Sequence, residues 1–178
     1  MRARRTTGGY ALGQGLGMIV GLVVAYVMAF LVLTFGLFIP SQVIPPALVS
    51  EFLSVNDLEL RVAIVGTVLY PYYLGSHLSF GATQTTVLTF VTWGTAGLVA
   101  GLLARGFLEG LFASLFAVII GAFLTWLLIF LIQPYADLFA LFGTESMIIM
   151  QLALQGSIWP GVASIVGGLL GGGISRDR

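Results

Sequence analysis

Four apolar stretches, each close to the roughly 20 residues that a helix needs to cross a lipid bilayer, dominate the sequence. They cover residues 16–38, 86–104, 111–132 and 148–171. Because 58% of the residues are hydrophobic and only 8% are charged, a water-soluble core could not cover so much apolar surface. We therefore predict an all-α integral membrane protein, a four-transmembrane-helix bundle formed by a single membrane domain that comprises residues 1–178.

The charged residues divide between the two sides of this arrangement. Six of the seven arginines fall in the two terminal tails and in the short loop at 105–110, namely Arg2, Arg4, Arg5, Arg105, Arg176 and Arg178, whereas Arg61 falls in the first outer loop. Five carboxylates fall in the other two loops: Glu51, Asp57, Glu59, Asp137 and Glu145. Because loops rich in basic residues stay in the cytoplasm, we predict a multi-pass protein of the cell membrane with both termini cytoplasmic.

The first outer loop, residues 39–85, is predicted to form a small extracytoplasmic cap. Polar and apolar residues alternate from Leu58 to Ile64, which favours an outer β-strand that reaches about Leu69. A second extended piece is expected at 76–80, and residues 44–53 are typical of a short interfacial helix. The apolar run Val62–Tyr70 is too short for a fifth span, and a fifth crossing would move the loop at 105–110 to the outer side.

The second and fourth spans resemble one another. A shift of 66 positions aligns Thr85, Thr89 and Trp93 with Gln151, Gln155 and Trp159, and beyond Pro160 a shift of 67 positions aligns residues 98–103 with 165–170. This similarity predicts two repeated helical hairpins in parallel orientation. The alternative is chance similarity, because apolar helices use a small set of residue types.

Small residues recur at every fourth position of the first span, and a shorter series lies in the fourth. These residues are Gly9, Gly13, Gly17, Gly21, Ala25 and Ala29, followed by Gly167 and Gly171. Such small-xxx-small faces allow two helix backbones to approach closely, so we predict a helix-packing interface. The partner helix could belong to the same bundle or to another subunit, and the sequence leaves both interpretations open.

Neutral polar residues form the candidate polar patch in the outer half of the bundle: Thr85, Thr89, Thr92, Gln151 and Gln155. They could join two helices by hydrogen bonds, or they could line a vestibule for a solute or a lipid headgroup. Aromatic residues, Tyr70 and Trp93 among them, are predicted to form a belt at the outer interface.

No catalytic constellation is visible in the sequence. The single histidine, His77, falls in the predicted outer loop, and the chain has no cysteine, so we predict no metal site and no cofactor. Zero net charge argues against a nucleic-acid partner.

Two functions remain open after these exclusions. The first is a non-enzymatic structural subunit of a larger complex, whose partners are membrane lipids and other membrane-protein subunits. The second is a small homo-oligomeric channel or facilitator that uses the candidate polar patch.

Overall fold

The computed structural model describes residues 7–34, 61–62, 65–66, 69–70, 84–132 and 156–176. Four helices account for most of them: α1 (Thr7–Thr34), α4 (Gln84–Ala104), α5 (Phe107–Ile132) and α8 (Ile158–Ser175). The described part of the chain contains no β-strand, so the predicted all-helical fold is confirmed there.

Three helices are long and apolar enough to cross a membrane. The apolar stretches are Gly13–Val32 in α1, Phe107–Leu127 in α5 and Ile158–Ser175 in α8, and a shorter stretch, Leu88–Ala104, lies in α4. A bilayer offers no water to backbone N–H and C=O groups, and a helix pairs these groups within itself. Pro160 fits this fold because it lies in the first turn of α8, where a missing N–H breaks no helical hydrogen bond.

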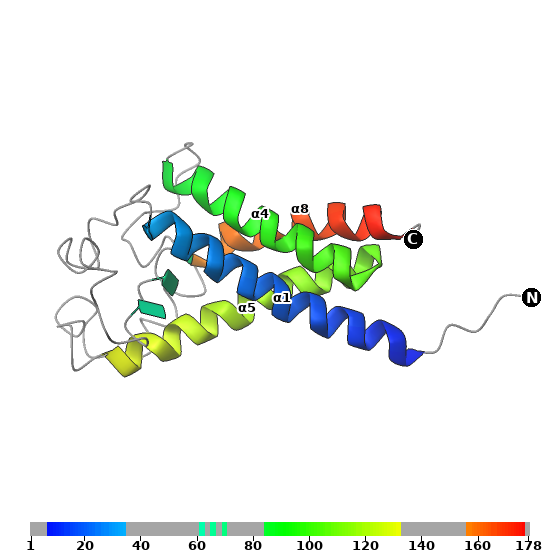
Figure 1. Cartoon of the computed structure of the whole chain (residues 1–178), viewed down its shortest axis with the longest axis horizontal. Helices are drawn as coiled ribbons and strands as arrows, with labels where there is room; N and C mark the ends of the chain where they lie inside the picture. The colour runs from blue at the N-terminus through cyan, green and yellow to red at the C-terminus, as the bar shows by residue number, and fades with distance from the viewer. Residues whose placement is uncertain are drawn as a thin grey trace, which may run out of the picture.

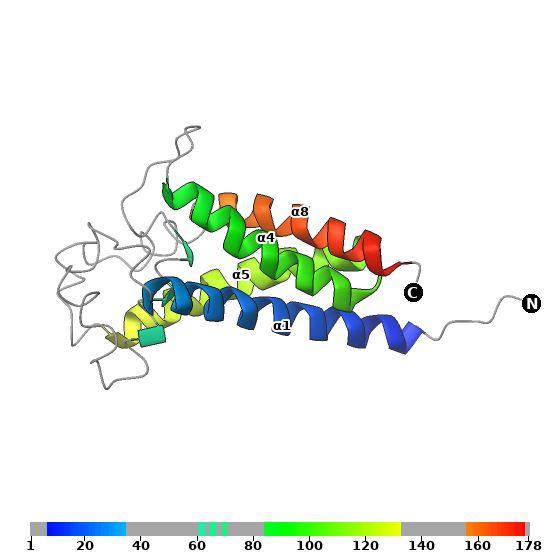
Figure 2. The same cartoon turned by 45° about the horizontal axis from the view of Figure 1, so that its top comes forward.

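The helices pack as an up-and-down bundle, in which consecutive helices run in opposite directions (Figure 1). α4 and α5 contact each other, α1 packs against both of them, and α8 packs against both as well. The start of α1, the turn between α4 and α5 and the end of α8 lie together at what we call the terminal end (Figure 2). The opposite end, where α4 begins and α1 ends, is the far end. As a result, α4 and α8 run parallel to each other.

The turn between α4 and α5 is very short. Arg105 adopts a positive φ of 59°, and its N–H donates to the carbonyl of Gly101 at 3.2 Å, which is how a left-handed residue ends an α-helix. Glu109 lies in the first turn of α5, where a carboxylate interacts favourably with the helix dipole. A Cβ on Gly106 would collide with that carboxylate, so a larger residue here would require the Glu109 side chain to move.

Large apolar side chains cover the outside of the bundle. They include Leu16, Ile19, Val23 and Val27 on α1, Phe112, Phe116, Ile120 and Phe123 on α5, and Val162, Val166, Leu170 and Ile174 on α8. The interior is lined largely by alanine, serine and glycine. This distribution suits a bundle that is surrounded by lipid, because bulky side chains then face an apolar solvent.

The predicted outer strand is wrong for the residues that the structure describes. Arg61, Val62, Val65, Gly66 and Leu69 are helical. The short polar–apolar alternation from Leu58 to Ile64 therefore does not determine the backbone conformation at these positions. The predicted interfacial helix at 44–53 and the extended piece at 76–80 lie outside the described residues.

Candidate functional site

The small-residue face of α1 packs against α4 of the same chain. A Cβ placed on Gly17 would lie 3.5 Å from the backbone N of Ala104, and one on Gly21 would lie 2.9 Å from the Cβ of Ala100. Ala25 and Ala29 continue this face and are buried. The structure therefore fills the face with the chain's own helix, and only Gly9 falls where its surroundings are not described.

Glycine also brings α4 and α8 into backbone contact, along what we call the glycine seam. A Cβ on Gly97 would collide with the carbonyl oxygen of Ser164, and one on Gly101 would collide with that of Gly168. The two residues of each pair are 67 positions apart, which is the shift that aligns the two helices in the sequence. Gly167 and Gly171 meet α4 in the same way, next to Leu98.

The glycine seam also includes α5. A Cβ on Gly110 would lie 3.1 Å from the Cα of Gly101, and one on Gly168 would lie 2.8 Å from the Cβ of Ser114. The buried Ser164 hydroxyl donates to the carbonyl of Ser114 at 3.2 Å. Three backbones thus converge where a methyl group would not fit, and the interior of this part of the bundle is closed by the chain itself.

A different contact closes the bundle toward the far end. Tyr70 and Trp93 are fully buried, and their rings lie 5.6 Å apart at 53°. The Tyr70 hydroxyl donates to the carbonyl of Val118 in α5 at 2.8 Å. The Trp93 indole N–H donates to the carbonyl of Leu69 at 3.0 Å. These two hydrogen bonds attach residues from the predicted outer loop to the insides of α4 and α5.

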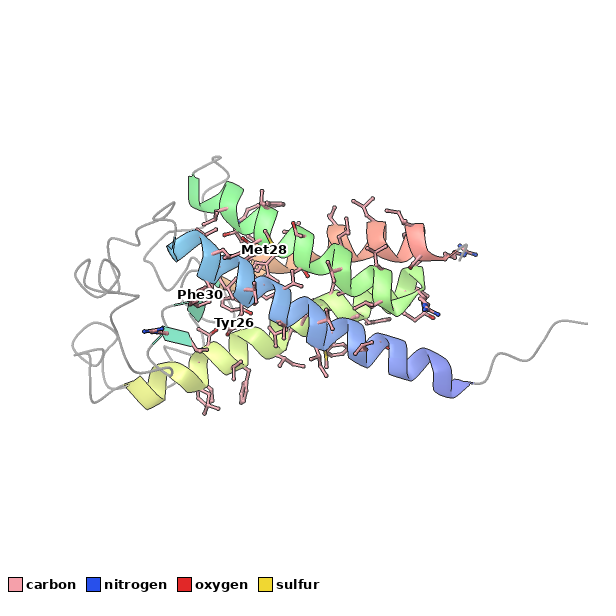
Figure 3. All side chains as sticks on the ribbon, in the orientation of Figure 1. Tyr26, Met28 and Phe30 are labelled. Carbon is pink, nitrogen blue, oxygen red and sulfur yellow. The ribbon has the colours of Figure 1, made fainter. Side chains whose placement is uncertain are left out.

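Hydroxyl groups extend this contact to α1. The Thr125 hydroxyl donates to the carbonyl of Gly121 at 2.8 Å and lies 3.0 Å from the hydroxyl of Tyr26, which projects from α1 toward α5 (Figure 3). Because the single Thr125 hydrogen is already donated, Tyr26 is the donor in the second bond. A Cβ on Gly66 would lie 3.3 Å from that of Thr125, so Gly66 packs directly against the Thr125 side chain.

The structure places only part of the candidate polar patch. Thr89 and Thr92 are buried on the inner face of α4, beside Trp93 in the sequence. Thr85 belongs to the first turn of α4, but its side chain lies outside the described residues, as do Gln151 and Gln155. The predicted contact between the threonines and the two glutamines of the patch therefore stays a prediction.

Two members of the predicted aromatic belt lie elsewhere. Tyr70 and Trp93 are inside the bundle and contact each other instead of the lipid–water boundary. Sequence reasoning missed them as a buried pair, because residues 62–70 are apolar at nearly every position and show no period that marks an inward face.

No group of three or more histidine, aspartate or glutamate side chains that could hold a metal ion occurs among the described residues. His77 lies outside them. Comparisons of the chain with protein-family models, with curated proteins and with solved structures found no match. Its function therefore has to be argued from the geometry of the bundle.

Proposed function

We propose that this chain is a non-enzymatic, multi-pass structural subunit of a larger membrane complex. The observation that carries the proposal is the separation of residues by size. Glycine and alanine of α1, α4 and α8 face one another, whereas bulky apolar side chains face outward. A bundle closed in this way interacts with its surroundings through its outer faces, which suit lipids and the helices of other subunits.

The partner contact in this proposal lies on α5. Phe112 and Phe116 are half-exposed and stack with ring centroids 6.4 Å apart, and Phe123 lies 5.0 Å from the ring of Trp126. Rigid aromatic side chains provide large contact areas at low entropic cost and are enriched at the centres of interfaces. The small-residue faces do not serve this purpose here because α4 of the same chain occupies them.

The orientation in this proposal follows the arginines. Arg105 and Arg176 are exposed at the terminal end of the bundle. Basic residues next to membrane spans favour the cytoplasmic side. We therefore propose that the protein lies in the cell membrane with the terminal end, and with it both chain termini, in the cytoplasm.

Native mass spectrometry of mild-detergent extracts tests the proposal. The wild-type chain should appear together with other membrane chains in a fixed ratio, and Phe116→Ala combined with Phe123→Ala should release them. The matched control, Val166→Ala with Leu170→Ala, truncates equally exposed side chains on α8 and should keep the complex. A wild-type chain that appears alone contradicts the proposal.

A second candidate is the homo-oligomeric channel or facilitator, which is supported by the buried hydroxyls of Thr89 and Thr92 on the inner face of α4. Native mass spectrometry would then show copies of this chain only. In proteoliposomes, Thr89→Val would abolish solute flux by a folded protein, because an apolar constriction raises the barrier to polar solutes. Flux that is the same for Thr89→Val and the wild type would contradict this candidate.

A further inference from the structure

α1 ends and α4 begins at the far end of the bundle. Between these points, six described residues lie at 61–62, 65–66 and 69–70, and we call them the inserted residues. Val65, Gly66, Leu69 and Tyr70 are buried. The contacts of three of them fix their depth in the bundle.

The inserted residues go deeper as their number rises. Gly66 contacts Thr125, which is close to the far end of the apolar stretch Phe107–Leu127 of α5. The Tyr70 hydroxyl reaches Val118, which is near the middle of the same stretch. At about 1.5 Å per helical residue, these two contact points are roughly 10 Å apart along α5, and the Tyr70 side chain spans part of this distance.

Three elements surround the deepest point. A Cβ on Gly121 of α5 would collide with the Tyr70 hydroxyl, would lie 2.8 Å from Cδ1 of Leu22 on α1 and would lie 3.5 Å from the ring of Trp93 on α4. The inserted residues therefore fill the space that α1, α4 and α5 enclose.

We propose that the inserted residues belong to a re-entrant membrane segment, which enters the bundle from the far end, reaches the level of Trp93 and plugs that end. A helix that ends inside a membrane leaves carbonyl groups without helical partners, and these need donors from the protein. Trp93 supplies one such donor to Leu69 at 3.0 Å. The Leu69 carbonyl lies beside Trp93, within the apolar stretch Leu88–Ala104 of α4, so it is at membrane depth.

The plug has a chemical consequence for the interior. It packs Gly66 against the Thr125 hydroxyl and places the Tyr70 ring beside Trp93. Any polar solute that entered the bundle from the far end would first have to displace these residues. This inference concerns the depth of one segment and stands whether or not the chain has a partner subunit.

Disulfide formation in intact membranes tests the position of the plug, and the absence of native cysteine makes the result specific. The Cβ atoms of a Gly66→Cys/Thr125→Cys variant would start 3.3 Å apart, close to the roughly 3.5–4.5 Å of disulfides. Mild oxidation should link them, as shown by mass spectrometry of non-reduced peptides. The control, Gly15→Cys with Thr125→Cys, should stay reduced, because a Cβ on Gly15 contacts nothing within 4 Å.

Labelling rates test whether the segment is buried from the outer side. Leu69→Cys should react with a membrane-impermeant thiol reagent at least tenfold more slowly than Ser41→Cys in the predicted outer loop. A folded Gly66→Cys/Thr125→Cys variant that forms no disulfide would overturn the proposal, and so would labelling of Leu69→Cys at the rate of Ser41→Cys.

Discussion

The glycine seam and the plug close the same bundle with opposite kinds of residue. Along the seam, Gly97 and Gly101 bring the backbone of α4 onto that of α8. Toward the far end, Tyr70 and Trp93 fill the space with two aromatic rings and bind backbone carbonyls through their polar atoms. We therefore expect an added atom to destabilise the seam, whereas the plug should be destabilised by the loss of side-chain volume.

The largest effect is expected from emptying the plug region. Trp93→Ala removes a fully buried indole and its hydrogen bond to Leu69. Large-to-small substitutions of this type cost about 3–5 kcal/mol of the free energy of unfolding, because the cavity does not close. Reversible unfolding in mixed micelles measures the loss. A change below about 1 kcal/mol would show that the plug does not depend on this ring.

The seam should fail when one methyl group is added. Gly101→Ala places a Cβ against the carbonyl of Gly168 and 2.7 Å from the backbone N of Gly172. Neither backbone can rotate away, so we expect a loss of about 1–3 kcal/mol in the same unfolding measurement.

Gly173 offers the matched control for the seam because it lies on the same helix pair but points outward. A Cβ at this position contacts nothing within 4 Å. Gly173→Ala should therefore stabilise α8 by up to about 1 kcal/mol through its higher helix propensity. Equal destabilisation by Gly101→Ala and Gly173→Ala would remove the distinction between the inward and outward glycines.

A smaller effect separates volume from hydrogen bonding in the plug. Tyr70→Phe keeps the ring beside Trp93 but removes the hydroxyl that donates to Val118. The Val118 carbonyl keeps its place in α5, so we expect a loss of roughly 0.6–1 kcal/mol. A loss as large as that of Trp93→Ala would mean that the hydrogen bond, and not the filled volume, holds the segment.

The smallest effect concerns the turn at the terminal end. Arg105 has a positive φ, which is unfavourable for a residue with a Cβ. Arg105→Gly should relieve this strain and raise the free energy of unfolding by at most about 1 kcal/mol, partly offset by the greater freedom of glycine in the unfolded chain. A decrease would indicate that the arginine side chain makes a stabilising contact that outweighs the strain.

The helices and their small-residue contacts were predictable from the sequence because both depend on local patterns. The stretches at 86–104 and 111–132 lie within α4 and α5, and the fourfold spacing of Gly13, Gly17 and Gly21 marks a face that does contact another helix. The sequence left open which helix that would be, since small-residue faces carry no information on the identity of their partner.

The plug was not predictable because its contacts join residues that are distant in the sequence. Tyr70 meets Val118 and Leu69 meets Trp93, and neither pairing leaves a repeat or a motif. The short alternation before Val62 also favoured a strand, although packing against three helices selects a helix at the described positions. The glutamine side of the candidate polar patch lies outside the described residues.

A disulfide between α1 and α4 tests the central claim, that the small-residue faces pack within one chain. The Cβ of a cysteine at Gly21 would start 2.9 Å from that of a cysteine at Ala100, and a small outward shift gives disulfide geometry. We predict that oxidised membranes of the Gly21→Cys/Ala100→Cys variant contain the disulfide within single chains. Disulfide-linked pairs of chains from Gly21→Cys alone, with no intrachain bond in the double variant, would contradict the account.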